Sequence, residues 1–313
     1  MVKGRTEKMT KSFKRRKTGV RLFNSLPDKL LMTVVYIVLI LVLLVILLPL
    51  IFIVASSFSS TEAVTSGRVY FWPVEFSTEG YKIILQSPYI VKSFLMSVFY
   101  TVSGTFISVG LTLLAAYPLT RKDLKIRGFI MVLFTLTMFI NGGMIPTYLL
   151  VKSLNLTDTV WAILLPGALS IWNVIITRTY IQSSIPGELF ESASIDGCSD
   201  WRFFKSIVLP LSLPIIAVIV LLYAVSKWNS FFDALIYLNN RELYPLQLVL
   251  RSLLVQGNSG SFDLSLSEQM NKAALKTLLQ YALIVVSTAP ILMVYPFVQR
   301  YFIKGIMVGS LKG

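Results

Sequence analysis

The chain contains no histidine, a single cysteine and no Gly-Lys pair. The missing histidine excludes His-based zinc sites and Ser-His-Asp catalysis. With Cys198 alone, no internal disulfide can form. The absence of Gly-Lys excludes the GxxxxGK[ST] loop that cradles nucleotide phosphates. We therefore predict no catalytic and no metal-binding residues.

Charge is also scarce. Only 14% of the 313 residues are charged, whereas about a quarter is usual in soluble proteins, and 55% are hydrophobic. The run 30–55 has no charge, and as a helix it would extend about 39 Å, enough to cross a hydrocarbon core of about 30 Å. These features predict an all-α integral membrane protein, because lipid-exposed backbone must satisfy its own hydrogen bonds.

Basic residues are concentrated near the predicted spans. Ten of the 29 lysines and arginines fall in residues 1–29, and "RKDLKIR" (121–127) carries four against one acid. This placement fits the positive-inside rule and argues against nucleic-acid binding.

We predict six transmembrane helices, an even number, so both termini lie on the same side of the membrane. The basic flanks predict that this side is cytoplasmic. A basic tail, 1–29, precedes the six-helix transmembrane domain, 30–300, and a tail, 301–313, follows it. The predicted spans are 30–55, 91–119, 129–150, 160–182, 207–230 and 273–297.

Two spans carry polar faces. In the second, helix packing is the favoured interpretation of a face formed by Ser97, Thr101, Thr105, Ser108 and Thr112. In the fifth, two interpretations stay open for a face near the outer end, which is either a polar pathway or an anchor at the outer interface. Its members are Ser226, Asn229, Ser230 and Asp233.

The loop after the fourth span carries acids that topology does not require: Glu188, Glu191, Asp196 and Asp200. A short helix is expected from Glu188 to Ile195, with Gly197 in the left-handed position that ends helices. A second short helix, 200–207, should lead to Pro210 and re-entry into the membrane. This hairpin either docks into another protein or lies solvated on the surface.

The residues "ESASIDGCSDWRFFKSIVLPL" resemble the EAA loop of permease subunits in binding-protein-dependent ATP-binding-cassette (ABC) importers. Ser192 and Cys198 replace the usual alanines of the motif. The residues that match the motif are Glu191, Ala193, Asp196, Gly197, Ile207, Leu209 and Pro210. The C-terminal "QRYFIKGIMVGSLKG" resembles the tail of sugar permeases of the maltose-importer type. Other segments, such as "GGMIPTYLLV" and "WNSFFDALIYL", resemble more narrowly the LplC/YtcP-type oligosaccharide permeases.

The resemblance implies the type I ABC importer (MetI/MalG-like) permease fold, with a cytoplasmic coupling helix in the loop 186–210. Glu191 would pair with a basic residue of a separate ATPase, Ala193 would permit close approach, and Gly197 would make the turn. Asp196 belongs to the same motif. Leu189, Phe190 and Phe203 would fill the ATPase cleft or brace the loop, and residues 301–313 would also reach the ATPase.

The resemblance also implies partners and location. These are a second related permease, two ATPase subunits that hold ATP and Mg²⁺, and an extracytoplasmic sugar-binding lipoprotein, all at a bacterial plasma membrane. The outward segments 57–90 and 238–271 would meet the binding protein. This chain would bind no cofactor and would not be an enzyme.

Sugars are held by placed polar groups and by flat aromatic faces. Candidates for the substrate pathway are Trp172, Asn173, Tyr223, Trp228 and Asn229, with packing or interface anchoring as the alternative for each. An ion-coupled secondary transporter of a small polar solute is the main alternative function, although the proposed spans keep ionisable groups near their ends. A membrane enzyme is a weaker alternative, because no chemical constellation is found.

Overall fold

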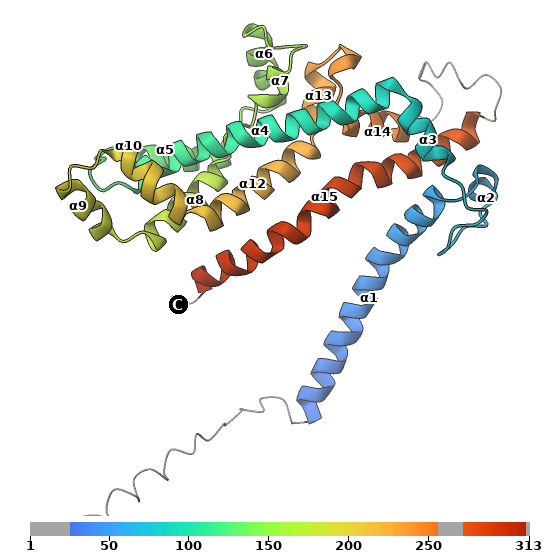
Figure 1. The fold of residues 1–313 in the computed structure, drawn as a ribbon, viewed down its shortest axis with the longest axis horizontal. Helices are drawn as coiled ribbons and strands as arrows, with labels where there is room; N and C mark the ends of the chain where they lie inside the picture. The colour runs from blue at the N-terminus through green and yellow to red at the C-terminus, as the bar shows by residue number, and fades with distance from the viewer. Residues whose placement is uncertain (1–25, 256–271, 311–313) are drawn as a thin grey trace, which may run out of the picture. The chain divides into compact units, whose positions relative to one another are not determined.

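The computed structural model describes residues 26–255 and 272–310, and these residues form helices and connecting segments with no strand. Most of the predicted tail 1–29, part of the predicted outer loop 238–271 and residues 311–313 lie outside the described residues. The chain divides into two compact units, residues 1–51 and 52–313. The helices are labelled in Figure 1.

The first half of the chain begins with α1 (Leu26–Ser57) and α2 (Thr61–Thr65), followed by α3 (Glu79–Gln86), α4 (Pro88–Thr120), α5 (Arg127–Phe139) and α6 (Met144–Ser153). The second half comprises α7 (Trp161–Leu164), α8 (Ile171–Ser184), α9 (Gly187–Ile195), α10 (Asp200–Phe203), the π-helix η1 (Phe204–Val208), α11 (Leu209–Leu211), α12 (Leu213–Trp228), α13 (Phe232–Tyr237), the 3₁₀-helix η2 (Arg241–Leu243), α14 (Leu246–Val255) and α15 (Lys272–Ser310).

Three predicted spans are single helices long and apolar enough to cross a membrane. The predicted spans 30–55 and 91–119 correspond to α1 and α4, and 273–297 lies within α15. Helix α15 continues to Ser310, so most of the predicted tail 301–313 is helical and is continuous with the last predicted span.

The predicted span 129–150 is wrong as one straight helix. It consists of α5 and α6, which are bent by 115° relative to each other. Between them, Gly143 adopts φ +86° and ψ 177°, a conformation that essentially only glycine tolerates. The side chain of Asn141 accepts a hydrogen bond from the Gly143 amide at 2.9 Å and stabilises the turn.

The predicted span 160–182 is also wrong as a continuous helix. It is interrupted between α7 and α8 by a segment that contains Pro166 and Gly167, the latter with φ +65°. Proline removes a backbone donor and a positive φ ends helical geometry, which explains the break.

The predicted span 207–230 is likewise broken. Residues 200–211 and α12 are bent by 79°, and Ser212 lies between Pro210 and Pro214 at the bend. The described residues thus contain three candidate spans, or five if each bent pair counts as one. The count of six stays a prediction.

Helix α4 packs against α12 and α8, and α12 also packs against α15 (Figure 1). The small polar face of α4 lies in this packing, because Ser97, Thr105, Ser108 and Thr112 are all buried. Ser97 accepts a hydrogen bond from the Leu246 amide at 2.8 Å, and Thr112 bonds the Tyr223 hydroxyl at 2.7 Å. The predicted packing role of this face is confirmed.

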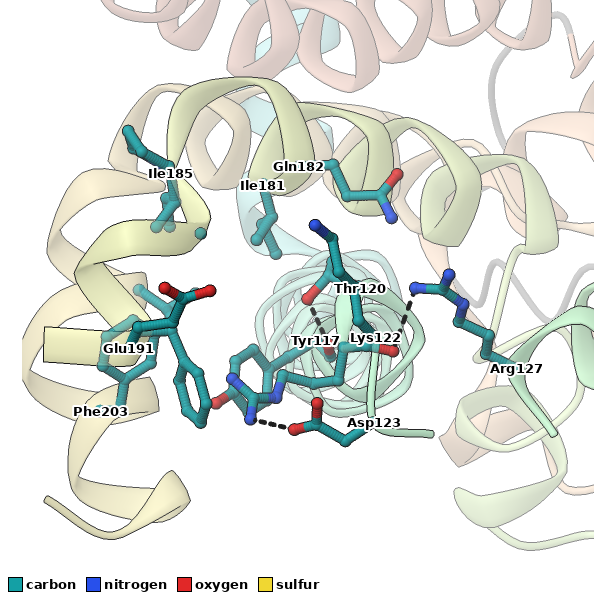
Figure 2. A pocket seen from close by; sticks show the side chains of 15 residues that line it. Tyr117, Thr120, Lys122, Asp123, Arg127, Ile181, Gln182, Ile185, Glu191 and Phe203 are labelled. Atoms are coloured by element: carbon teal, nitrogen blue, oxygen red, sulfur yellow. Dashed lines mark hydrogen bonds and ion pairs between the residues drawn. The ribbon is translucent and has the colours of Figure 1, made fainter. Parts of the chain in front are cut away.

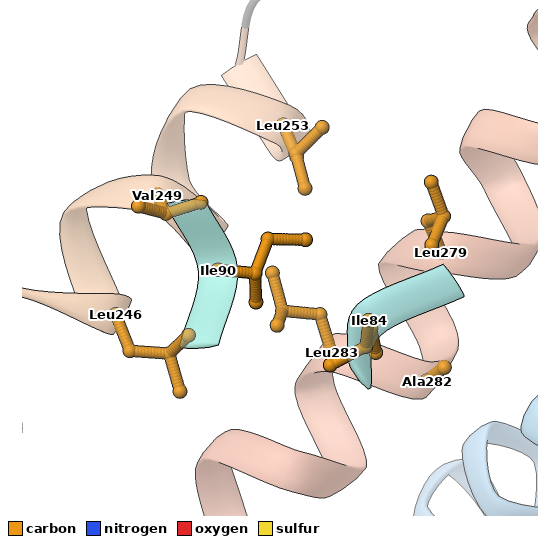
Figure 3. Close-up of a cluster of buried hydrophobic side chains, with 8 residues drawn as sticks. All are labelled: Ile84, Ile90, Leu246, Val249, Leu253, Leu279, Ala282 and Leu283. Atoms are coloured by element: carbon orange, nitrogen blue, oxygen red, sulfur yellow. The ribbon is translucent and has the colours of Figure 1, made fainter. Parts of the chain in front are cut away.

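A hydrophobic cluster joins the N-terminal end of α4 to α3, α14 and α15 (Figure 3). Its buried members are Ile84, Ile90, Leu246, Val249, Leu253, Leu279, Ala282 and Leu283. Burying a side chain of this size stabilises the fold by about 1.5–3 kcal/mol, so the cluster fixes α14 against the two long helices.

Candidate functional site

The acidic loop folds into two short helices that meet at a turn. We call residues 187–208 the elbow; it comprises α9, a turn, α10 and η1. Helix α9 follows Pro186 and has Glu188 in its first turn, where a carboxylate interacts favourably with the helix dipole. Helix α10 begins after Ser199, whose hydroxyl accepts a hydrogen bond from the Arg202 amide. Both short helices were predicted.

The turn has the hydrogen bonds of a Schellman motif. The Cys198 amide donates to the Ala193 carbonyl at 2.9 Å, and the Gly197 amide donates to the Ser194 carbonyl at 3.1 Å. Gly197 has φ +71°, as predicted for a left-handed helix end. Ala193 and Cys198 both pack against the hydrophobic cluster beneath the elbow. Ala193 therefore faces this chain's own interior and helps to close the turn.

Aromatic rings brace the two arms of the elbow. Phe190 and Phe203 meet edge to face with centroids 5.2 Å apart. Phe203 is 3% exposed and Phe190 is half-buried, so both rings pack within the elbow. Leu189 is 42% exposed and faces outward.

The exposed side of the elbow combines acids with apolar groups. Glu191 and Asp196 are exposed, and within the described part of the chain neither has an ion-pair partner. Ile195 is 87% exposed and Trp201 is 64% exposed. These two residues were not predicted as part of the site, although exposed large apolar side chains beside acids are the signal that could have found them.

A cavity of about 510 Å³ lies beside the elbow (Figure 2). Glu191 and Phe203 line it from the elbow, and Ile181 and Gln182 line it from α8. Further lining residues come from the end of α4, from the loop that follows it and from the start of α5: Tyr117, Thr120, Arg121, Lys122, Asp123 and Arg127.

One hydrophobic cluster extends from the elbow into the helix bundle. Phe203, Phe204 and Val208 of the elbow pack in the same cluster as Ile219 and Tyr223 of α12. The Tyr223 hydroxyl accepts the Ser170 amide at 3.0 Å, in the break between α7 and α8. Continuous packing therefore connects the elbow to that break.

A second cavity, of about 490 Å³, lies at the α7–α8 break. Four of the five predicted pathway residues line it: Trp172, Asn173, Tyr223 and Asn229. Trp172 is 59% exposed and offers an aromatic face, whereas Tyr223 is 4% exposed and its hydroxyl is already hydrogen-bonded. Trp228 is placed elsewhere, since its indole donates to the Ser287 carbonyl at 2.8 Å and its ring packs against Phe94.

Lys227 was not predicted for this cavity. Its ammonium donates to the carbonyls of Ile163 at 3.0 Å and of Leu164 and Pro166 at 3.5 Å, where it caps the end of α7. The signal in the sequence that could have identified Lys227 is a lysine standing alone in an apolar run. Asp233 also lines the cavity; burial raises the pKa of its carboxyl, and the Lys227 ammonium opposes that effect.

The bundle, the bent helices and the acidic elbow define a membrane permease. The chain belongs to the family described as binding-protein-dependent transport system inner membrane component, which matches residues 90–308. It is thus the membrane-embedded permease subunit of an ABC importer, not an ion-coupled secondary transporter and not itself an enzyme.

Similar proteins from Bacillus subtilis (strain 168) include YtcP and LplC. The polygalacturonan/rhamnogalacturonan transport system permease protein YtcP is 45% identical over 265 residues, which cover 85% of this chain and 92% of YtcP. Protein LplC is 43% identical over 269 residues, which cover 85% of this chain and 89% of LplC.

A solved structure also matches. It is the crystal structure of a bacterial ABC transporter involved in the import of the acidic polysaccharide alginate, with a TM-score of 0.83 and 33% identity, covering 90% of this chain and 99% of that chain. Membership of this class implies an ATPase, a binding protein and a second permease as partners. Permease subunits of this class normally bind no cofactor themselves.

Proposed function

We propose that this chain imports an oligosaccharide and that its elbow is where an ATPase subunit drives the movement. The observation that carries the coupling role is the elbow itself, which is closed by a Schellman turn, braced by Phe190 and Phe203, and exposes acids beside apolar groups. The oligosaccharide assignment is supported by the names of the relatives, which include transport systems for polygalacturonan/rhamnogalacturonan and for arabinooligosaccharides.

In this proposal Glu191 pairs with a basic residue of the ATPase. Leu189, together with Ile195 and Trp201, fills an apolar cleft around that ion pair. Asp196 and Gly197 set the direction of the turn, and Ala193 lets it close. Phe190 and Phe203 keep the two arms rigid, so that a push on α9 moves the whole elbow.

The partners follow from one elbow per chain. Two ATPase subunits, which hold ATP and Mg²⁺, need two elbows, so a second and related permease completes a heterodimer. A sugar-binding lipoprotein delivers the substrate to the outward segments 57–90 and 238–271. Both termini are cytoplasmic in a bacterial plasma membrane, as the basic flanks of the spans favour.

The cavity at the α7–α8 break is the proposed contact with the sugar. Trp172 supplies an aromatic face, and Asn173 and Asn229 supply hydrogen-bonding groups at the same cavity. Tyr223 positions the break through its bonds to Thr112 and Ser170. Trp228 anchors α12 against α15.

The coupling role is tested with Glu191→Lys in the complete complex in proteoliposomes. Uptake is measured for a panel of galacturonan, arabinan and raffinose-type oligosaccharides. Reversing the charge at the proposed ion pair should abolish ATP-driven uptake while the protein still inserts, because an unpaired charge at a buried contact costs about 2–5 kcal/mol.

Glu188→Lys is the matched control, since it makes the same charge change one turn earlier on the same exposed helix. It should retain most of the uptake. Equal uptake by Glu191→Lys and the unmodified chain would remove the coupling role. Failure of the unmodified complex to import any sugar of the panel would overturn the oligosaccharide assignment.

A further inference from the structure

Arg121 stands at the junction between α4 and the elbow. It follows directly after α4, and its side chain is only 16% exposed although it lies in the basic loop 121–127. The positive-inside rule explains a positive charge in this loop, but it does not require that the charge be buried away from solvent. Lys122 and Lys125 of the same loop are exposed, as a charge that serves only topology would be.

The guanidinium of Arg121 contacts both arms of the elbow. It lies over the Phe190 ring of α9, 3.0 Å from the centroid, and it is 3.6 Å from the Asp200 carboxylate at the start of α10. A further ion pair, 2.7 Å to Asp123, holds the guanidinium from its own loop. A planar guanidinium suits this task, since it can stack on a ring and pair with carboxylates at once.

The end of α4 is also tied to its neighbours by arginines. Arg178 of α8 donates to the Leu119 carbonyl at 2.9 Å, and Arg127 donates to the Arg121 carbonyl at 3.2 Å. The ring of Tyr117, one turn earlier in α4, packs against Phe204 of the elbow at 5.0 Å. Movement at Arg121 therefore reaches a helix end that is fixed to α8, not a frayed one.

We propose that Arg121 is the positioning residue that carries movement of the elbow to α4. The inference rests on the coupling role proposed for the elbow. When the ATPase moves the elbow, the paired and stacked guanidinium pulls the end of α4 with it. Helix α4 in turn contacts Tyr223 through Thr112, at the edge of the proposed sugar cavity.

The test compares Arg121→Gln with Lys125→Gln, which removes the same charge from the same loop. Uptake of the best-imported sugar of the panel and ATP hydrolysis are measured on the same proteoliposomes. Arg121→Gln should assemble and hydrolyse ATP but import about tenfold less sugar per ATP, and Lys125→Gln should match the unmodified chain. Arg121→Lys keeps the charge and loses the stack, so uptake per ATP should be intermediate.

A double-variant cycle tests whether Arg121 transmits movement through Phe190 or only supports assembly of the complex. If Arg121 acts through Phe190, then Arg121→Gln combined with Phe190→Leu should lower uptake per ATP no further than Arg121→Gln alone. The proposal is overturned if Arg121→Gln leaves uptake per ATP unchanged, or if the two substitutions lower uptake per ATP additively. It is also overturned if uptake falls only in proportion to the loss of assembled complex. If Glu191→Lys abolishes uptake while Arg121→Gln does not, the elbow keeps its role and only Arg121 loses it.

Discussion

At position 197 of the elbow, backbone shape matters more than side-chain contacts. Gly197 has a positive φ, but a Cβ added there would meet no atom within 4 Å. Its importance is therefore conformational, because the Schellman turn needs a left-handed residue at that point. The acid Glu191 differs, since its exposed carboxylate has no ion pair among the described residues and is available to a partner.

Gly197→Val and Gly197→Asn separate these effects. The left-handed conformation costs a β-branched residue about 1–2 kcal/mol of conformational energy, whereas asparagine adopts it more readily. Valine should therefore reduce co-purification with the ATPase and lower uptake, and asparagine should retain most of both. Equal effects of the two residues would show that the left-handed conformation is not what matters at position 197.

Among the elements, the bent helices distinguish this fold from a bundle of straight spans. Hydropathy predicted the membrane segments 129–150 and 160–182, but it records only how apolar a run is. It does not detect that Gly143 and Gly167 take positive φ values within those runs. The glycines and Pro166 were visible in the sequence, but whether such residues break a helix depends on tertiary packing.

The elbow was predicted more fully than the spans because its signals are local. A proline, an acidic first turn and a glycine at the helix end lie close together in sequence. The contacts of Arg121 with Phe190 and of Lys227 with the Ile163 carbonyl join residues more than sixty positions apart. No local pattern encodes such contacts, so sequence reasoning assigned Arg121 to topology and passed over Lys227.

The α5–α6 bend can be tested by paired glycine variants. Gly143→Ala should lower the melting temperature in detergent, because its φ of +86° and ψ of 177° cost a residue with a Cβ about 1–3 kcal/mol. Gly142→Ala is the control, since its added Cβ would meet only Pro146 at an ordinary 3.9 Å. A melting temperature that is unchanged in Gly143→Ala, or lowered equally in both, would contradict the glycine explanation of the bend.

For residues 52–313 as a whole, the notable feature is continuity between two distant sites. The elbow cluster reaches Tyr223 of α12, and Tyr223 bonds both Thr112 of α4 and Ser170 at the α7–α8 break. Packed cores shift between discrete arrangements more readily than they deform. An elbow displaced by an ATPase would therefore reorient helices that border the proposed sugar cavity.

The most direct test places a photo-crosslinking residue at Ile195, the most exposed large apolar residue of the elbow, in the assembled importer. The same probe at Leu85, which is 75% exposed in segment 57–90, proposed to face outward, is the control. The account predicts a crosslink from position 195 to the ATPase subunit and none from position 85. An active complex that shows no ATPase crosslink from position 195, or shows one from position 85, would contradict it.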